Sequence, residues 1–358
     1  MKITRVSLYR MEVPLTTPYH TSIAEIPFFT TVLAVLSSEG KQAAGESTPL
    51  LGYSFESPAE VWEFVRSKGS DLLGKETGEA YASLEPLQAT APFATTTLMT
   101  ALEMLDPLLC PGPAGLGGQV PIVGILNVSR SEEIPDCVSR LFAEGYETIK
   151  VKVGFEIGKD IRKVQQVQEL VGNRGLIRID ANQGYSYENA LKFVHMIDGG
   201  NIELFEQPFP EDQWDAMRAF APECPLPLML DESIYGLEDI ERAKEGQCAR
   251  FIKLKLMKTG SFQRLLKMGQ RTMDCGFKLI LGNGIATEVG CYHEALSYLK
   301  MGLKTAGEMN GFLKPKRPIF RSPLPFREGK IILEAGQSAE IDLEEVERLT
   351  VEKVHSDY

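Results

Sequence analysis

The feature that most constrains the fold of this chain is a regular alternation of short apolar segments with amphipathic segments across residues 121–311. The apolar segments have the length of strands, and helical segments such as 131–145, 189–198 and 261–276 separate them. Strands that alternate with helices form parallel sheets, because each helix returns the chain to the edge where the previous strand began. Eight such strands predict a closed barrel of the TIM type rather than an open sheet. The predicted strands are residues 121–126, 148–154, 176–182, 202–208, 226–233, 251–257, 278–283 and 305–311.

The segments outside this alternation follow other patterns. Residues 314–325 contain four prolines and cannot form an eighth helix, so the predicted barrel is of the (β/α)7β kind. Strands followed by helices are typical of an α+β domain, and this order precedes the barrel. The strands expected there are 3–13, 30–38 and 41–48, and the helices are 58–69 and 94–109.

The domain boundaries follow from these patterns. Residues 110–121 are rich in Gly and Pro and are the predicted linker. We therefore predict an α+β capping domain over residues 1–116 and the catalytic barrel over 117–322. We expect the C-terminal segment, 323–358, to return to the capping domain and complete it.

Composition excludes several classes of partner. The chain has 49 acidic and 38 basic residues, a net charge of −11, so no basic face is expected for nucleic acid or an anionic membrane. The six cysteines are widely spaced and favour a reducing compartment. Arg5 and Arg10 lie where the apolar region of a signal peptide would have to be, and no segment approaches the 18 consecutive apolar residues of a transmembrane helix. The sequence therefore predicts a cytoplasmic protein. The four histidines share no zinc motif, so a metal is expected to have oxygen ligands.

A polar residue follows or ends seven consecutive predicted strands, at intervals of 24 to 28 residues, about one strand and one helix. Charged residues also end strands simply because strands end at solvent, but seven consecutive units favour a shared site. In TIM-type barrels the C-terminal ends of the strands form the active site. The seven residues are Lys152, Asp180, Glu206, Asp231, Lys255, Asn283 and Glu308.

Two sets among these residues predict particular chemistry. Asp180, Glu206 and Asp231 come from neighbouring strands, and three such carboxylates suit Mg²⁺, although a solvated acidic rim is the alternative. Lys152 and Lys255 come from strands four apart in a ring of eight, so they face each other across this patch. Each lysine belongs to a Lys-x-Lys pair whose members share one face. Facing lysines predict a site with two acid/base groups.

Taken in order, the segments IKVKVG, IDAN, FEQP, LDES and IKLKLMKTGS resemble the enolase superfamily, in particular its muconate lactonizing enzyme subgroup. They are most similar to the dipeptide (Ala-Glu) epimerases of that subgroup. The segment TPLLGYSFESP resembles the capping domain, so the resemblance covers nearly the whole chain. The resemblance implies Mg²⁺, with Mn²⁺ as a substitute, on Asp180, Glu206 and Asp231; an acid/base pair of Lys152 and Lys255 with Lys150 as electrostatic helper; and Asn182 and Glu232 as supporting residues.

The last predicted strand departs from the epimerase pattern. The epimerases carry Asp-x-Asp there to hold a substrate ammonium, whereas this chain has Glu308 and Asn310 and keeps one negative charge. Asn283 stands where the mandelate racemase subgroup has a catalytic histidine, which argues against that branch. The residues predicted to contact substrate are Glu308, Asn310 and Asn283, with His20 and Tyr53 from the capping loops.

The resemblance implies Mg-dependent removal of the α-proton of a small-molecule carboxylate through an enediolate. Racemisation or epimerisation of an amino acid derivative or dipeptide is the predicted outcome, and we expect a homo-oligomer. Cycloisomerisation, dehydration or o-succinylbenzoate synthesis would use the same two lysines. Outside the superfamily, a Schiff-base aldolase would use one lysine as nucleophile, and a non-catalytic binding protein would keep only the fold.

Overall fold

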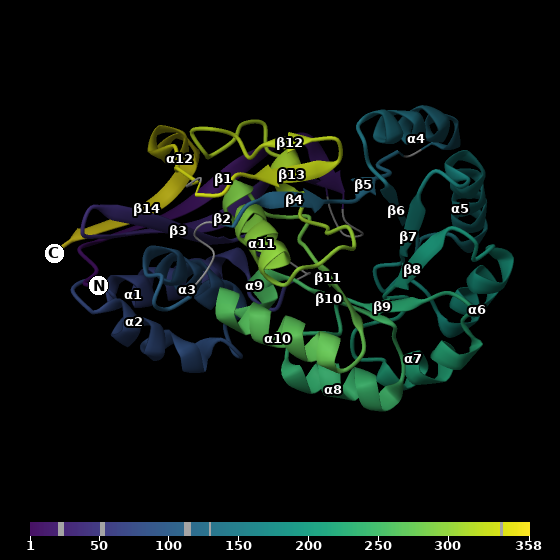
Figure 1. The fold of residues 1–358 in the computed structure, drawn as a ribbon, viewed down its shortest axis with the longest axis horizontal. Helices are drawn as coiled ribbons and strands as arrows, with labels where there is room; N and C mark the ends of the chain where they lie inside the picture. Colours follow the sequence, from purple (N-terminus) through teal and green to yellow (C-terminus); the bar gives the residue numbers. More distant parts are fainter. Residues whose placement is uncertain (21–24, 51–53, 111–115, 129, 337–338) are drawn as a thin grey trace.

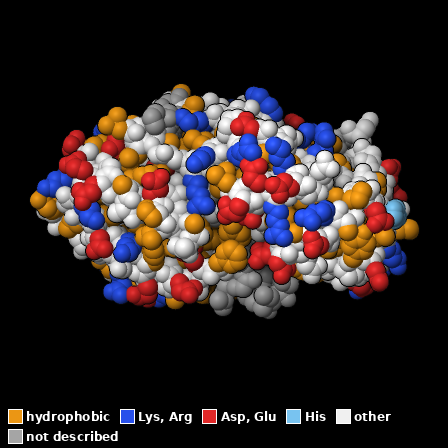
Figure 2. Space-filling view, turned by 90° about the horizontal axis from the view of Figure 1, so that it is seen from below, with side chains coloured by type: hydrophobic (Ala, Val, Ile, Leu, Met, Phe, Trp, Pro, Cys, Tyr) orange, Lys and Arg blue, Asp and Glu red, His pale blue; other side chains and the backbone are white. Residues whose placement is uncertain are grey.

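The computed structural model of the protein describes residues 1–20, 25–50, 54–110, 116–128, 130–336 and 339–358. Figure 1 shows a sheet with helices at the end of the molecule that holds both termini and a curved row of parallel strands surrounded by helices at the other end. Acidic and basic side chains are interspersed over the face in Figure 2. No helix within the described ranges is long and apolar enough to cross a membrane.

The N-terminal part is built on a four-stranded antiparallel sheet. Its order is β14-β1-β2-β3, so the C-terminal strand of the chain lies beside the first one. The strands are β1 (Arg5–His20), β2 (Glu25–Ser38), β3 (Lys41–Ser47) and β14 (Thr350–Asp357). The three predicted N-terminal strands are confirmed, and β1 and β2 extend beyond the predicted ranges.

Three helices accompany this sheet, α1 (Pro58–Ser70), α2 (Thr77–Leu84) and α3 (Pro92–Leu105). The helix α1 begins at a capping box, in which the Ser57 N–H donates to Glu60 and the Glu60 N–H donates to the Ser57 hydroxyl. The predictions of α1 and α3 are confirmed. The helix α2 was not predicted, and it is only eight residues long.

Seven parallel strands form the barrel in the order β11-β10-β9-β8-β7-β6-β5. Nearly all residues of β6 to β11 are buried, as expected for strands packed on both faces. The strands are β5 (Gly124–Ile125), β6 (Thr148–Lys152), β7 (Leu176–Asp180), β8 (Ile202–Glu206), β9 (Leu228–Leu230), β10 (Phe251–Leu254) and β11 (Lys278–Leu281).

The helices around the barrel follow the predicted alternation. They are α4 (Ile134–Ala143), α5 (Ile157–Val171), α6 (Tyr187–Met196), α7 (Trp214–Phe220), α8 (Leu237–Gly246), α10 (Phe262–Asp274) and α11 (Glu288–Lys300). Two further helices are short: α9 (Leu256–Thr259) follows β10, and α12 (Leu343–Leu349) directly precedes β14. The 3₁₀ helices are Glu85–Leu87, Ser131–Glu133, Ala221–Glu223 and Gly311–Leu313.

The eighth predicted strand, 305–311, is wrong in extent. Only Gly307 forms a bridge there, but the backbone of this segment still connects the two ends of the seven-stranded sheet. Glu308 N donates to Leu281 O of β11 (2.8 Å), and Gly307 N donates to Pro121 O (2.8 Å). A Cβ on Gly282 would lie 2.4 Å from Glu308 N, so only glycine permits this close approach. Segment 305–311 therefore closes the barrel with a minimum of strand structure.

The predicted linker 110–121 is also wrong in part. Its last residues form β4 (Gly118–Pro121), which pairs with β13 (Lys330–Leu333), and β13 pairs with β12 (Phe326–Arg327). Residues 330–333 therefore belong to this small sheet, and the later β14 belongs to the N-terminal sheet. The domain boundaries themselves stay a prediction.

Candidate active site

Charged side chains from several strands lie inside the barrel, because alternate residues of a strand point to the same face. Residues two apart in a strand share a face, so Lys150 and Lys152 of β6 point the same way, as do Arg178 and Asp180 of β7. The alternate residues, such as Ile179, belong to the hydrophobic core that the surrounding helices complete. The inside of the barrel at this level is therefore ionic rather than apolar.

Two buried ammonium groups lie among the carboxylates. Lys150 Nζ lies 2.9 Å from Asp180 Oδ2 and 2.6 Å from Glu206 Oε2. Lys253 Nζ lies 3.0 Å from Glu206 Oε1. Both ammonium groups also contact Glu308 Oε2, at 2.8 Å and 2.6 Å. Glu206 and Glu308 therefore each bridge two lysines from opposite sides of the barrel.

Three lysines surround Asp231, which follows β9. Its Oδ2 lies 3.1 Å from Lys253 Nζ and 2.8 Å from Lys255 Nζ. Lys258 of α9 donates to the backbone carbonyl of Asp231 (2.8 Å) and lies 3.9 Å from Oδ1. That Oδ1 accepts no hydrogen bond from the described residues. Asp231 thus has strong positive surroundings and one carboxylate oxygen left over.

Arg178 connects the barrel strands beneath these residues. Its side chain is fully buried, and its Nε donates to Glu203 of β8 (2.7 Å). Its two terminal nitrogens reach the closing segment, where they donate to Glu308 Oε1 (3.1 Å) and to the carbonyl of Ala306 (2.6 Å). Arg178 therefore holds Glu308 in the orientation in which Glu308 accepts from the two lysines.

These contacts set the protonation of the lysines and of Glu206. Burial alone would lower the pKa of Lys150, but the charges of Asp180, Glu206 and Glu308 raise it above its ordinary value. The pKa of Lys253 is likewise raised despite burial. Burial and the charge of Asp180 raise the pKa of Glu206 to about 8. Lys150 and Lys253 therefore act as fixed cations rather than as proton carriers.

The pKa values of two other carboxyl groups, Asp231 and Glu308, are lowered instead. Burial opposes ionisation of Asp231, but the charges of three nearby lysines hold its pKa well below the ordinary value. The pKa of Glu308 is lowered in the same way by Lys150, Lys253 and Arg178. Both carboxylates are ionised at neutral pH and already compensated by cations.

The chemistry of Asp180, Glu206 and Asp231 fits a divalent cation. All three carboxylates are buried, and oxygen ligands of this kind suit Mg²⁺. The unpartnered Asp231 Oδ1 is a buried anionic oxygen that such an ion would satisfy. In the part of the chain that the structure describes, the three do not themselves form a metal-binding cluster. The ammonium groups of Lys150 and Lys253 lie between them, so an ion would replace some of these contacts.

The residues predicted to support the ligands lie beside them. The Asn182 N–H donates to Asp180 Oδ1 (2.9 Å), and its side-chain amide donates to Glu232 Oε1 (3.2 Å). Burial and the charge of Asp231 raise the pKa of Glu232, whose Oε2 has no hydrogen-bond partner among the described residues. Asn182 thus connects the ends of β7 and β9.

The two predicted asparagines make loop contacts. Asn283 Oδ1 accepts from Ile285 N (2.9 Å), and Asn310 Nδ2 donates to Val123 O (2.7 Å). Both side chains are buried next to the strand ends. Tyr53 lies outside the described residues. The backbone of His20 ends β1, and its side chain lies outside what the structure describes.

Sequence patterns alone missed several members of the site. Lys253 was identified only as the partner of Lys255 in a Lys-x-Lys pair, and Arg178 and Lys258 were not considered. A charged residue within an otherwise apolar strand, as in LIRID, was the available signal for Arg178. The contacts that give these residues a role join segments far apart in the sequence.

Comparisons with known proteins place this arrangement in context. A family model described as enolase C-terminal domain-like matches residues 133–346. The L-Ala-D/L-Glu epimerase of Bacillus subtilis is 28% identical over 81% of this chain and 83% of its own length. The N-succinyl-L-Arg/Lys racemase of Bacillus cereus is 25% identical over 98% of each chain. The crystal structure of a Cytophaga hutchinsonii dipeptide epimerase with Mg and D-Ala-L-Val has a TM-score of 0.86, at 21% identity over 99% of this chain and 100% of that chain.

Proposed function

Because this chain belongs to the enolase C-terminal domain-like family, we propose that it is a racemase or epimerase that removes and returns the α-proton of a small carboxylate. The observation that carries the proposal is the placement of Lys152 and Lys255. They lie at the ends of β6 and β10, with three strands between them in a closed barrel. A substrate held between them presents one face to each lysine.

In this proposal the two lysines have opposite tasks at any one moment. The neutral lysine accepts the α-proton from its face of the substrate, and the charged lysine delivers a proton to the other face. Inversion then leaves the two lysines with exchanged protonation states. Lys150 stays charged among Asp180, Glu206 and Glu308, and its ammonium supplies fixed positive charge near the reacting carboxylate.

Asp180, Glu206 and Asp231 are the proposed ligands of Mg²⁺, with Asn182 and Glu232 as their supports. Bound Mg²⁺ would supply the positive charge that stabilises a carboxylate substrate as its α-proton leaves. Asp231 Oδ1 accepts no hydrogen bond from the described residues, and Asn182 donates a backbone N–H to Asp180. Mn²⁺ is proposed as a substitute, since it accepts the same oxygen ligands.

The substrate class comes from the relatives and from the site. The relatives are named for Ala-Glu, for N-succinyl-Arg and -Lys, and one neighbour holds D-Ala-L-Val. These are carboxylates with a substituted α-nitrogen, and we propose the same class here. Asn283, Asn310, His20 and Tyr53 remain the proposed substrate contacts.

Glu308 was expected from the sequence to bind a substrate ammonium group. Lys150, Lys253 and Arg178 already compensate its charge, so we propose that Glu308 instead orients the two lysines. On this basis Glu308→Gln lowers kcat/KM equally for substrates with and without an amine. A loss of kcat/KM confined to amine-bearing substrates would instead support binding of a substrate ammonium group by Glu308.

The direct test is exchange of the α-proton in D₂O, followed by proton NMR for a panel of dipeptides and N-acyl amino acids with the Mg²⁺-loaded protein. We expect exchange with inversion for at least one member. Elimination or ring closure without inversion would favour a lyase or cycloisomerase, and borohydride trapping of a lysine adduct would favour an aldolase. No exchange with any carboxylate would reject the proposal.

Two properties of the whole protein are also proposals. The six cysteines are free thiols, which supports a reducing compartment such as the cytoplasm. The expected homo-oligomer is tested by light scattering of the purified chain.

A further inference from the structure

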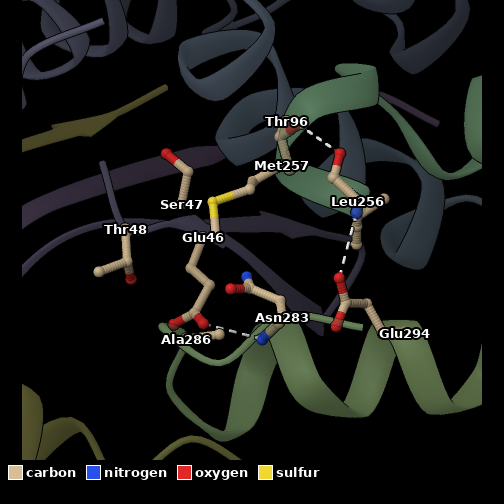
Figure 3. Close-up of a pocket in the computed structure, with 10 residues that line it drawn as sticks. Glu46, Ser47, Thr48, Thr96, Leu256, Met257, Asn283, Ala286 and Glu294 are labelled. Atoms are coloured by element: carbon tan, nitrogen blue, oxygen red, sulfur yellow. Dashed lines mark hydrogen bonds between the residues drawn. The ribbon is translucent and has the colours of Figure 1, made fainter. Parts of the chain in front are cut away.

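A small cavity lies where the N-terminal sheet meets the barrel, close to the ends of β10 and β11 (Figure 3). It encloses about 10 Å³, the space of one water-sized group. The lining residues are Glu46, Ser47, Thr48, Thr96, Leu256, Met257, Asn283, Ala286, Gly290 and Glu294. Two of these are buried carboxyl groups, and none is a lysine, arginine or histidine.

Glu46 is the satisfied carboxyl group of the pair. It extends from β3 to the first turn of α11, where Oε1 accepts from the backbone N–H of Thr287 (2.7 Å) and of Gly290 (2.9 Å). Its Oε2 accepts from the Thr287 hydroxyl. Glu46 therefore has a structural role, joining the N-terminal sheet to the barrel helix α11.

Glu294, on α11, is the second buried carboxyl group of the cavity, and only one of its two oxygens accepts a hydrogen bond from the described residues. Its Oε1 accepts from the backbone N–H of Leu256 (3.1 Å), but its Oε2 has no hydrogen-bond partner among the described residues. The side chain is 1% exposed and lines the cavity. A buried polar oxygen without a partner is unfavourable unless another group binds to it.

The surroundings of Glu294 indicate what that group is. Burial raises the pKa of Glu294 to about 8 and that of Glu46 to about 7. The charged groups that influence Glu294 are Lys253 and Lys255 on the β10 side and Glu46 on the β3 side. A cation in the cavity would stabilise the ionised form of both carboxyl groups through its charge, and more strongly than a neutral donor, which contributes a hydrogen bond without the charge.

The cavity lies close to Lys255, one of the two proposed acid/base lysines. Leu256 directly follows Lys255, and Asn283 follows β11 at the mouth of the barrel. In Figure 3, Asn283 lies between the carboxyl groups of Glu46 and Glu294. A substrate whose α-carbon lies beside Lys255 is therefore close to this cavity.

We propose that Glu294 and the cavity form a subsite for a cationic nitrogen of the substrate, a primary or secondary ammonium group. This inference rests on the proposed function, since it assigns the place of the amine that Glu308 does not bind. The size of the cavity admits an ammonium head and excludes a planar guanidinium. Binding of the ammonium ionises Glu294, so about one proton is released at neutral pH.

The first experiment probes the cavity without turnover. The Mg²⁺-loaded protein is titrated with methylammonium chloride, with tetramethylammonium chloride at equal ionic strength as the control. Infrared difference spectra report the loss of a protonated carboxyl band. We expect this loss in the wild type with methylammonium only, and none in Glu294→Gln. Glu103→Gln, another buried glutamate outside the cavity, is the matched control and should respond as the wild type does.

The second experiment compares matched substrates in the D₂O exchange assay, each with an amine or with a hydroxyl in its place. We expect the wild type to prefer the amine at least tenfold in kcat/KM and Glu294→Gln to lose that preference. Equal responses of wild type and Glu294→Gln in both experiments, or equal use of amine and hydroxyl, would overturn the subsite. Exchange of any carboxylate would still support the proposed function, and without any exchange the methylammonium titration alone decides the subsite.

Discussion

Charged side chains at the centre of the barrel are buried, and contacts with groups of opposite charge offset the free-energy cost of their desolvation. Lys150 and Lys253 illustrate this, since each contacts three carboxylates within 3.1 Å. Removal of one partner changes the charge balance among groups that stay buried. Residues of this network are therefore expected to be sensitive to single substitutions, and a stability measurement must accompany each activity measurement.

The two strand-end lysines make separate predictions. Lys152→Ala and Lys255→Ala should each reduce racemisation by about 10²–10⁴-fold, the usual contribution of a positioned acid or base. Each variant should still exchange the α-proton of one enantiomer, because the remaining lysine serves one face. Proton NMR in D₂O with each enantiomer separately measures this. Wild-type exchange of both enantiomers by both variants would contradict the two-base assignment.

Glu206 tests the proposed metal site. Glu206→Gln should weaken Mg²⁺ binding by more than about tenfold, since a neutral amide is a poorer ligand than a carboxylate. Calorimetric titration with Mg²⁺, and with Mn²⁺ followed by electron paramagnetic resonance, measures affinity without turnover. Glu103→Gln is the control for loss of a buried carboxylate. Unchanged affinity in Glu206→Gln would exclude Glu206 as a ligand.

Among the elements, segment 305–311 is the least regular part of the barrel and depends most on side chains. The backbone N–H groups of Gly307 and Glu308 donate two hydrogen bonds that close the ring, and the Gly307 carbonyl accepts a third from Val123 N. Arg178 adds its contacts to Ala306 and Glu308. These contacts join β7 to a segment about 130 residues later. We interpret Arg178 as the side chain that keeps the closing segment in place.

Removal of the Arg178 charge tests this interpretation. Arg178→Met should lower the free energy of unfolding by about 3–5 kcal/mol, because it leaves Glu203 without its cation and removes one of the three cations around Glu308. Urea denaturation measures the loss. In the double variant with Glu308→Gln the two losses should be less than additive, since both remove the same ion pair. Strict additivity would show that Arg178 and Glu308 are not coupled.

In the whole molecule, buried carboxyl groups connect the N-terminal part to the barrel at the start of barrel helices. Glu46 of β3 accepts from the first turn of α11, and Glu103 of α3 accepts from the N–H groups of Phe262 (2.8 Å) and Gln263 (2.9 Å) at the start of α10. Helix N-termini favour a negative charge. The two parts are thus joined by polar contacts as well as by their hydrophobic cores.

These contacts predict a pH dependence of stability. Burial raises the pKa of Glu103 to about 7 from an ordinary value near 4.5, so the folded state binds this proton more tightly than the unfolded state. Its contribution to stability is full below pH 4.5 and is lost as the pH rises through 7, about 3 kcal/mol in total. Glu103→Gln should remove this part of the decline between about pH 4.5 and 7 in urea denaturation. An unchanged pH profile in the variant would contradict the shift.

Much of this organisation was predictable from local sequence patterns. The alternation of strands and helices depends on neighbours in the chain, and so does the placement of residues such as Ile149 and Lys150 on opposite faces of β6. The recurrence of polar residues at strand ends predicts the mouth of the barrel as the candidate site. The predicted strands 121–126 and 305–311 are right in place but wrong in extent, because hydrogen bonds to distant backbone limit β5 to Gly124–Ile125 and leave 305–311 irregular.

The sequence by itself determined the class of fold and the face on which each strand residue lies, since period-two and period-3.6 patterns are local properties of the backbone. Only the tertiary structure decided which charges meet across the barrel. Arg178 reaches Glu308 and Lys253 reaches Glu206 because strand order and barrel closure bring them together. Among the described residues, Glu294 Oε2 has no hydrogen-bond partner, which also depends on how α11 packs against its neighbours. Contacts of this kind depend on the positions of several elements at once, and no local pattern specifies them.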